Sequence, residues 1–207
     1  DEDDHEHAHA DAELEPVAVG AVGAVADLPQ LGQEAGAERL LDLVLQEAKK
    51  LPELPVVIDA DGLNLLAKKR LYSTLGRQYV LTPHLREMSR LSGKSVQEIA
   101  DDMTSAVMGQ QAGATIVLKD ARTLVSDGDW LYINLSGNSA LSTGGSGDVL
   151  SGMIGGLLAQ GCTQRTAATL AVYMHGLTAE QYCESAPPHC MLARDILEMI
   201  PKIGGNS

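Results

Sequence analysis

The stretch Ser142–Gly152 has the residue types of an anion-binding site. It reads Ser-Thr-Gly-Gly-Ser-Gly-Asp-Val-Leu-Ser-Gly, and an apolar run begins within it at Val149. Glycines let backbone N–H groups turn toward a ligand, because no Cβ blocks the approach. A helix that begins directly behind them directs its free N–H groups and its positive dipole end at the same point. The stretch therefore predicts an anion site, formed by Gly144, Gly145, Ser146 and Gly147.

Asp148 is the unusual residue of this stretch, because it places a carboxylate beside an anion site. Two roles fit its position. It could cap the N-terminus of the helix that follows, or it could act as a base that deprotonates a hydroxyl next to a bound phosphate. The spacing of the glycines alone leaves both interpretations open.

Further polar clusters share one position, directly after an expected strand: Asp59, Asp61 and Asn64; His84 and Glu87; and Lys119. In open α/β sheets, ligands bind at the carboxyl ends of the strands. Together with the glycine-rich stretch, the clusters indicate a phosphoryl-transfer or nucleotide-handling site. The stretch matches neither GxxxxGK[ST] nor a dinucleotide-binding GxGxxG after a strand.

The elements that must position these residues alternate between strands and helices. Helices are expected at Glu38–Lys50, Pro83 to about Leu91 with Thr82 as cap, Ser95–Gly113, Asp148–Gln160, Thr163–Glu184 and Leu192–Ile200. Strands are expected at Pro55–Asp59, Gln78–Leu81 and Ala114–Leu118, with a hairpin of Thr123–Ser126 and Trp130–Asn134. Val17–Ala26 could be a buried strand or a flexible segment. The alternation predicts an α/β fold with a mainly parallel sheet flanked by helices.

Several elements, in order, resemble signatures of the NAD(P)H-hydrate dehydratases of the ribokinase-like superfamily. They are Thr143–Leu150, Asp59–Asn64 as DADxLN, Leu81–His84 with Glu87 as LTPHxxE, Val117–Lys119 with Ala121–Thr123, Tyr132–Asn134 with Gly137-Asn138, and His175-Gly176. The resemblance implies a three-layer α/β/α sandwich and a repair reaction. The substrate would be NADH or NADPH hydrated on the nicotinamide ring, written NAD(P)HX. Its added hydroxyl would be phosphorylated by ADP or ATP with Mg²⁺, and phosphate would then leave.

The resemblance also implies roles for individual residues. Asp148 would be the general base, and the N–H groups of Gly145, Ser146 and Gly147 would hold the transferring phosphoryl. The nucleotide would lie against Lys119, Asp120, Ala121, Arg122, Thr123 and Gly147. The hydrated dinucleotide would lie against Gly32, His84, Asp61, Asn64 and Asp148, with Asp61 and Asn64 near phosphates or Mg²⁺. The stretch through Gln160-Gly161 favours ADP over ATP. We expect His175 to be a hydrogen-bonded core histidine.

The chain departs from the family pattern at several points. Leu85-Arg86 stands where the family has Pro-Gly, and Asp120 stands where it has Gly. Gly32 keeps one glycine of a family loop, but the glycine that precedes Leu31 in that loop is absent here. The first strands of the family have no visible counterpart in residues 1–30. We therefore expect an N-terminally incomplete ribokinase-like dehydratase domain over residues 17–207. Two alternatives stay open: a catalytically impaired nucleotide-binding paralogue, and a small-molecule kinase for a vitamin precursor.

Composition limits the remaining possibilities. Residues 1–16 form an acidic segment that predicts a disordered tail, and the whole chain has a formal net charge of −13 without a basic stripe for nucleic acid. The apolar run Val17–Ala26 is too short to span a membrane and lacks a basic region before it. Three cysteines without a CxxC pair predict reduced, small core residues. We expect a cytoplasmic protein that binds no nucleic acid and no membrane, and a homo-oligomer because family members commonly assemble.

Overall fold

A computed structural model describes residues 20–22, 33–109 and 112–203 of the chain. The expected acidic tail and Gly32 lie outside the described residues, so both predictions stay untested. Within the described part, no helix is long and apolar enough to cross a membrane.

Six strands of the described chain form one mixed sheet in sequential order. They are β1 (Gly20–Val22), β2 (Val56–Ile58), β3 (Tyr79–Leu81), β4 (Thr115–Leu118), β5 (Leu124–Ser126) and β6 (Leu131–Ile133). Strands β1 to β4 pair in parallel, whereas β4–β5 and β5–β6 pair antiparallel. The expected parallel sheet is confirmed for β1 to β4, and the predicted hairpin supplies the antiparallel part. Gly128 lies at its turn with a φ of 94°, in the left-handed region that glycine adopts without strain.

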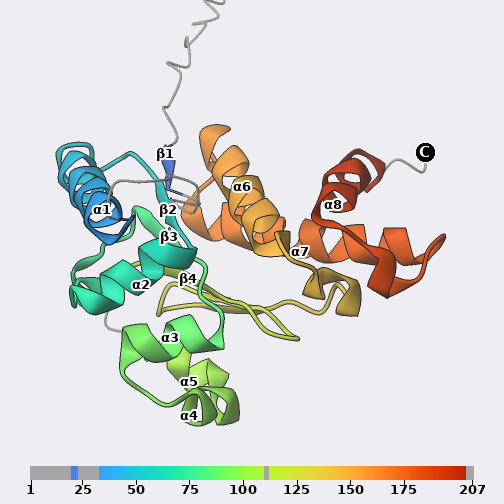
Figure 1. Cartoon of the computed structure of the whole chain (residues 1–207), viewed down its shortest axis with the longest axis horizontal. Coiled ribbons are helices and arrows are strands. Elements are labelled where there is room, and N and C mark those ends of the chain that lie inside the picture. The colour runs from blue at the N-terminus through green and yellow to red at the C-terminus, as the bar shows by residue number, and fades with distance from the viewer. Residues whose placement is uncertain (1–19, 23–32, 110–111, 204–207) are drawn as a thin grey trace, which may run out of the picture.

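Helices cover both faces of the sheet (Figure 1). One side carries α1 (Gln33–Lys50), α2 (Ala60–Lys68), α3 (Leu85–Ser92), α4 (Val96–Asp101) and α5 (Met103–Met108). The other side carries α6 (Ser146–Ala159) and α7 (Gln164–Cys183), and α8 (Ala193–Met199) packs against these two. Short 3₁₀ helices lie at Tyr72–Thr74 (η2), Ser139–Ser142 (η3), Pro188–Cys190 (η4) and Ile200–Lys202 (η5).

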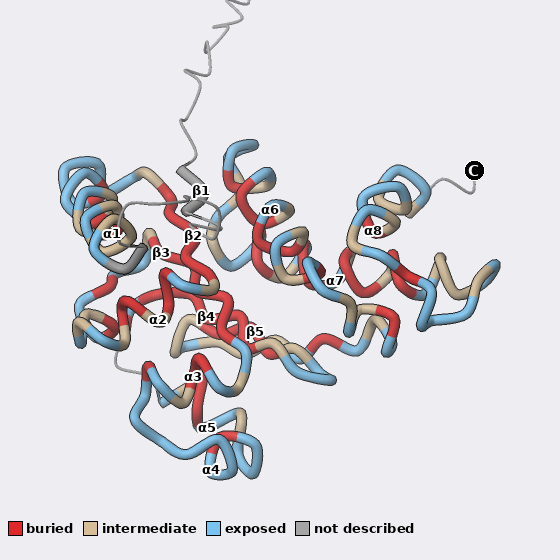
Figure 2. The backbone as a smooth tube through the Cα atoms, viewed as in Figure 1, coloured by how far each residue is buried: buried red, intermediate tan, exposed pale blue. Residues whose placement is uncertain are grey.

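Strands β2 to β5 are buried on both faces because their side chains alternate between two cores. Val57, Val80 and Val117 pack with α6 and α7, while their neighbours pack with the helices of the opposite face. Figure 2 shows the buried strands in the middle of the molecule. Such strands read as short continuous apolar runs, which is why the sequence predicts their positions closely.

Three local expectations were wrong. The single helix expected over residues 95–113 is divided between α4 and α5, because Asp102 leaves the helical conformation and its side chain caps Ser105 N–H. Helix α3 begins at Leu85 with His84 as its cap, whereas Thr82 is buried before it. Of the cysteines, Cys162 and Cys183 are half-buried and Cys190 is exposed, so they are not all core residues.

Two glycine-to-alanine substitutions should act in opposite directions. A Cβ on Gly176 of α7 would lie 2.1 Å from Ser136 Oγ and 2.7 Å from its carbonyl carbon. Because backbone must then move, we expect Gly176→Ala to lower the free energy of unfolding by roughly 2–3 kcal/mol. Gly156 has open space around it, so Gly156→Ala should raise that free energy by about 0.5–1 kcal/mol. Urea unfolding of both variants measures these two changes. Equal changes in the free energy of unfolding would contradict the close packing of Gly176 against Ser136.

Candidate active site

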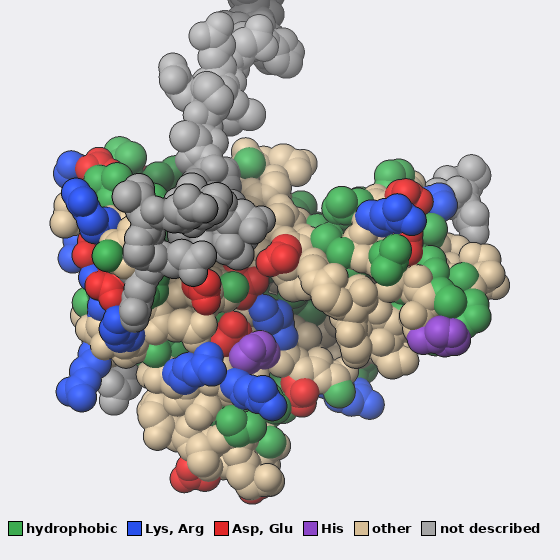
Figure 3. Space-filling view, in the orientation of Figure 1, with side chains coloured by type: hydrophobic (Ala, Val, Ile, Leu, Met, Phe, Trp, Pro, Cys, Tyr) green, Lys and Arg blue, Asp and Glu red, His purple; other side chains and the backbone are tan. Residues whose placement is uncertain are grey.

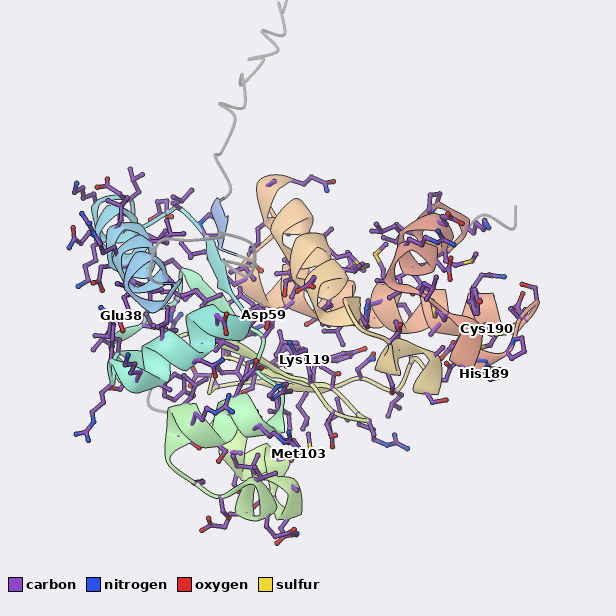
Figure 4. All side chains as sticks on the ribbon, in the orientation of Figure 1. Glu38, Asp59, Met103, Lys119, His189 and Cys190 are labelled. Atoms are coloured by element: carbon purple, nitrogen blue, oxygen red, sulfur yellow. The ribbon has the colours of Figure 1, made fainter. Side chains whose placement is uncertain are left out.

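The carboxylate of Asp59 joins three elements at the carboxyl edge of the sheet. Its Oδ1 accepts hydrogen bonds from Ala60 N–H at 2.8 Å and from Lys119 Nζ at 2.9 Å. Its Oδ2 accepts a hydrogen bond from Ser151 Oγ at 2.8 Å. Asp59 follows β2, Lys119 follows β4, and Ser151 lies in α6. Figure 4 labels Asp59 and Lys119, which lie between α2, α6 and the strand ends. Asp59 is only 4 % exposed, so its charge depends on these partners.

From the sequence, either Asp59 or Asp61 could cap the helix that follows β2, and the structure assigns the cap to Asp59. The predicted ligands Asp61 and Asn64 lie elsewhere on α2. Asn64 Nδ2 is 3.4 Å from Asp61 Oδ1, and Asn64 Oδ1 accepts a hydrogen bond from Arg90 at 2.6 Å. Ala60, directly after the cap, has a φ of 47°, a strained value for a residue with a Cβ.

Lys119 lies against the first turn of α6. A Cβ on Gly147 would be 3.3 Å from Lys119 Nζ and 3.9 Å from Asp59 Oδ2. A side chain here would shift the lysine ammonium group by a few tenths of an ångström, so the glycine lets the helix approach closely. The start of α6 is thereby fixed beside the lysine ammonium group.

The N-terminus of α6 carries no side-chain cap. Its N-cap, Gly145, has a φ of 85°, which permits the sharp turn into the helix. The expected donors Gly145, Ser146 and Gly147 all lie at this turn, but Ser146 N–H donates to Thr143 O at 3.3 Å. Asp148 follows at the third helical position and is exposed. An uncapped helix start is suited to hold an anion.

A pocket of about 820 Å³ opens in front of this helix start. Its walls include Asp59, His84, Glu87, Lys119, Asp120, Ala121, Thr123, Gly145, Ser146, Gly147, Asp148 and His175. Most of the predicted site residues are therefore brought together. Four others are not among the described residues that line it: Arg122, Gly144, Asp61 and Asn64.

The pocket contains more acids than bases. Asp59, Glu87, Asp120 and Asp148 line it beside one lysine, Lys119. The described residues contain no group of three or more His, Cys, Asp or Glu that could hold a metal ion by themselves. A polyphosphate entering this pocket therefore needs a counter-cation of its own.

His84 is held by a capping box at the start of α3. Its Nδ1 accepts a hydrogen bond from Glu87 N–H at 3.1 Å, and Glu87 Oε2 accepts one from His84 N–H at 2.8 Å. Because Nδ1 is an acceptor, the neutral ring carries its proton on Nε2. The ring is 49 % exposed, so this N–H is available to a ligand in the pocket.

His175 is a pocket residue that sequence reasoning placed only in the core. It is buried as expected, and its Nε2 lies 3.1 Å from Ser146 O and 3.2 Å from Ser146 Oγ. It also lines the pocket. Burial, and to a lesser extent the charge of Lys119, lowers the pKa of His175 to about 4. A neutral His175 thus ties α7 to the first turn of α6.

Comparison with known proteins identifies the family of the chain. Residues 4–202 match the family model described as NAD(P)H-hydrate dehydratase. The chain belongs to the NAD(P)H-hydrate dehydratase family. The resemblance seen in the sequence motifs is thereby confirmed.

Three relatives illustrate how much of this family the chain covers. It is 46 % identical over 138 residues to the ADP-dependent (S)-NAD(P)H-hydrate dehydratase of Neisseria meningitidis, covering 64 % of this chain and 47 % of the relative. A ribokinase-like superfamily protein from Enterococcus faecalis superposes with a TM-score of 0.74 at 28 % identity, over 88 % of this chain and 61 % of the other. An ADP/ATP-dependent NAD(P)H-hydrate dehydratase from Bacillus subtilis, co-crystallized with ATP/Mg²⁺, gives 0.64 at 31 % identity over 73 % and 56 %. The chain spans about half the length of the curated relative from Neisseria.

The ion pair of this dehydratase-family site can be tested by a double-mutant cycle. Asp59→Asn keeps an oxygen to cap Ala60 but removes the charge that Lys119 contacts. We expect Asp59→Asn and Lys119→Met each to lower the free energy of unfolding. The unfolding free energy lost by the double variant should be about 1–3 kcal/mol smaller than the sum of the losses in the two single variants. Strictly additive losses would mean that the two groups do not interact.

His175 should make stability depend on pH. Its folded-state pKa of about 4 lies below the ordinary 6.5, so the unfolded chain binds more protons between these values. The contribution of neutral His175 to the free energy of unfolding is therefore complete above pH 6.5 and is lost as pH falls toward 4. At pH 4.5 the loss is about 2–3 kcal/mol.

The variant His175→Gln keeps a donor for Ser146 and does not titrate. Between pH 7.5 and 4.5, the wild-type chain should lose about 2–3 kcal/mol more unfolding free energy than this variant. Parallel pH curves from chemical denaturation would contradict a buried, neutral His175.

Proposed function

We propose that this chain carries a site for the nucleotide-dependent dehydration of NAD(P)HX back to NADH or NADPH. One observation carries the proposal: the uncapped, glycine-bounded start of α6 and the carboxylate of Asp148 share one pocket. The helix start suits a phosphoryl group, and Asp148 stands at the position where a base would meet a hydroxyl next to that group. The family membership and the names of the relatives agree with this chemistry.

The proposed reaction has two balanced steps. The carboxylate of Asp148 takes the proton of the ring hydroxyl, whose oxygen attacks the terminal phosphoryl of ADP or ATP and releases AMP or ADP. The C–O bond then breaks, phosphate leaves with the ring oxygen, and a proton leaves the adjacent ring carbon. The N–H groups at the start of α6 stabilise the transferring phosphoryl. His84 donates to the hydrated dinucleotide from Nε2.

The nucleotide side of the pocket is proposed to be formed by Lys119, Asp120, Ala121, Thr123 and Gly147. The name of the Neisseria relative supports ADP as the phosphoryl donor. Mg²⁺ is proposed to enter with the nucleotide, because Mg²⁺ is commonly held by substrate phosphates and one or two carboxylates. The excess of carboxylates in the pocket fits this arrangement. A homo-oligomeric state and a cytoplasmic location stay predictions.

The direct test is an activity assay with hydrated NADH, Mg²⁺ and either ADP or ATP, following recovery of the dihydronicotinamide absorbance. Asp148→Asn should lower kcat at least about 100-fold while the fold is kept, because the side chain is exposed and only the base is lost.

Asp129→Asn is the matched control, since Asp129 is 83 % exposed and does not line the pocket. It should leave the rate within about 2-fold of wild type, in line with other exposed surface changes. A rate for Asp148→Asn equal to that of Asp129→Asn would refute the assigned base. Nucleotide binding without any turnover in the wild type would favour the impaired paralogue.

A further inference from the structure

A second, smaller pocket lies at the start of α3 and shares lining residues with the site. It has a volume of about 290 Å³ and is lined by His84, Leu85, Arg86, Lys119 and Asp120. Three of these residues, His84, Lys119 and Asp120, also line the larger pocket. A ligand that contacts His84 is therefore near Arg86, which lines the smaller pocket together with His84.

In the part of the chain that the structure describes, the Arg86 guanidinium group takes no part in holding the fold together. The cap of α3 is completed by His84 and Glu87, and Arg86 is exposed at the second position of the helix. Within residues 33–109 and 112–203, no acceptor or acid contacts it. A cation near a helix N-terminus is also electrostatically unfavourable. By contrast Arg90, one turn later, is bonded to Asn64.

The side chains of the smaller pocket favour binding of a phosphate group. A guanidinium group presents a planar fork of donors that matches phosphate oxygens. The chain is strongly acidic as a whole, with a formal net charge of −13. Arg86 and Lys119 nevertheless both line this small pocket, whose lining includes a single acid, Asp120. Figure 3 shows Lys and Arg side chains gathered around a histidine near the middle of this face. Lys119 is already paired with Asp59, which leaves Arg86 as the available cation.

We propose that Arg86 is a specificity-determining residue that binds a phosphate group of the hydrated dinucleotide. This inference rests on the proposed function. The phosphate has two sources: the pyrophosphate that NADHX and NADPHX share, or the 2′-phosphate that only NADPHX carries. Arg86 touches no reacting atom in this proposal, so it acts on KM rather than on the chemical step.

Steady-state kinetics of Arg86→Gln with both substrates, at saturating nucleotide, test the proposal. The KM should rise about 10-fold, since one charge-assisted contact is lost, while kcat stays within about 2-fold. The KM of Arg86→Lys should lie between those of the wild type and Arg86→Gln, because lysine keeps the charge and loses the fork of donors. A rise for NADPHX alone identifies the 2′-phosphate, and an equal rise for both substrates identifies the pyrophosphate.

Arg77→Gln is the matched control for net charge, because Arg77 is 91 % exposed and lines neither pocket. Unchanged KM values in Arg86→Gln, or the same rise in Arg77→Gln, would overturn the proposal. So would a loss of ADP affinity without a change in substrate KM. Calorimetric binding of intact NADPH and NADH to the same variants makes the comparison without turnover, so an inactive wild type would refute the proposed function and not this inference.

Discussion

The part-buried ion pair of Asp59 and Lys119 is the interaction on which the rest of the site depends. A carboxylate that is 4 % exposed needs its charge balanced, and the lysine is within 2.9 Å. The same carboxylate caps α2 and accepts a hydrogen bond from Ser151 of α6. Because all its partners must be present together, the ends of β2 and β4 and the start of α6 are held in one arrangement. The pocket is the space that this arrangement leaves.

The parallel part of the sheet makes such a convergence possible. Strands β2, β3 and β4 run in the same direction, so the residues that follow them meet at one edge. His84 and Lys119 even form an isolated bridge beyond the strand ends. Helix α6 lies on the face of the sheet opposite α2 and α3, and His175 of α7 holds its first turn through Ser146. The anion site is thus built from local glycine conformation, and its position is set by contacts between residues distant in sequence.

The sequence predicted what depends on local pattern. Short apolar runs located β2, β3 and β4, and the glycine-rich stretch located the start of α6 to within two residues. The break at Asp102 was missed because a capping side chain overrode a helical apolar pattern. The choice of Asp59 over Asp61 as the central carboxylate depends on Lys119, which is 60 residues away. The contact of His175 with Ser146 spans 29 residues. Neither pairing leaves a signal in spacing, because only the fold brings the partners together.

The fate of the ring oxygen tests the central claim most directly. NADHX carrying oxygen-18 in its added hydroxyl would be incubated with the protein, Mg²⁺ and ADP, and the released phosphate analysed by mass spectrometry. If the hydroxyl attacks the phosphoryl group held at the start of α6 and phosphate then leaves, each released phosphate carries one oxygen-18 atom. Recovery of NADH with unlabelled phosphate, and the label in water, would contradict the account.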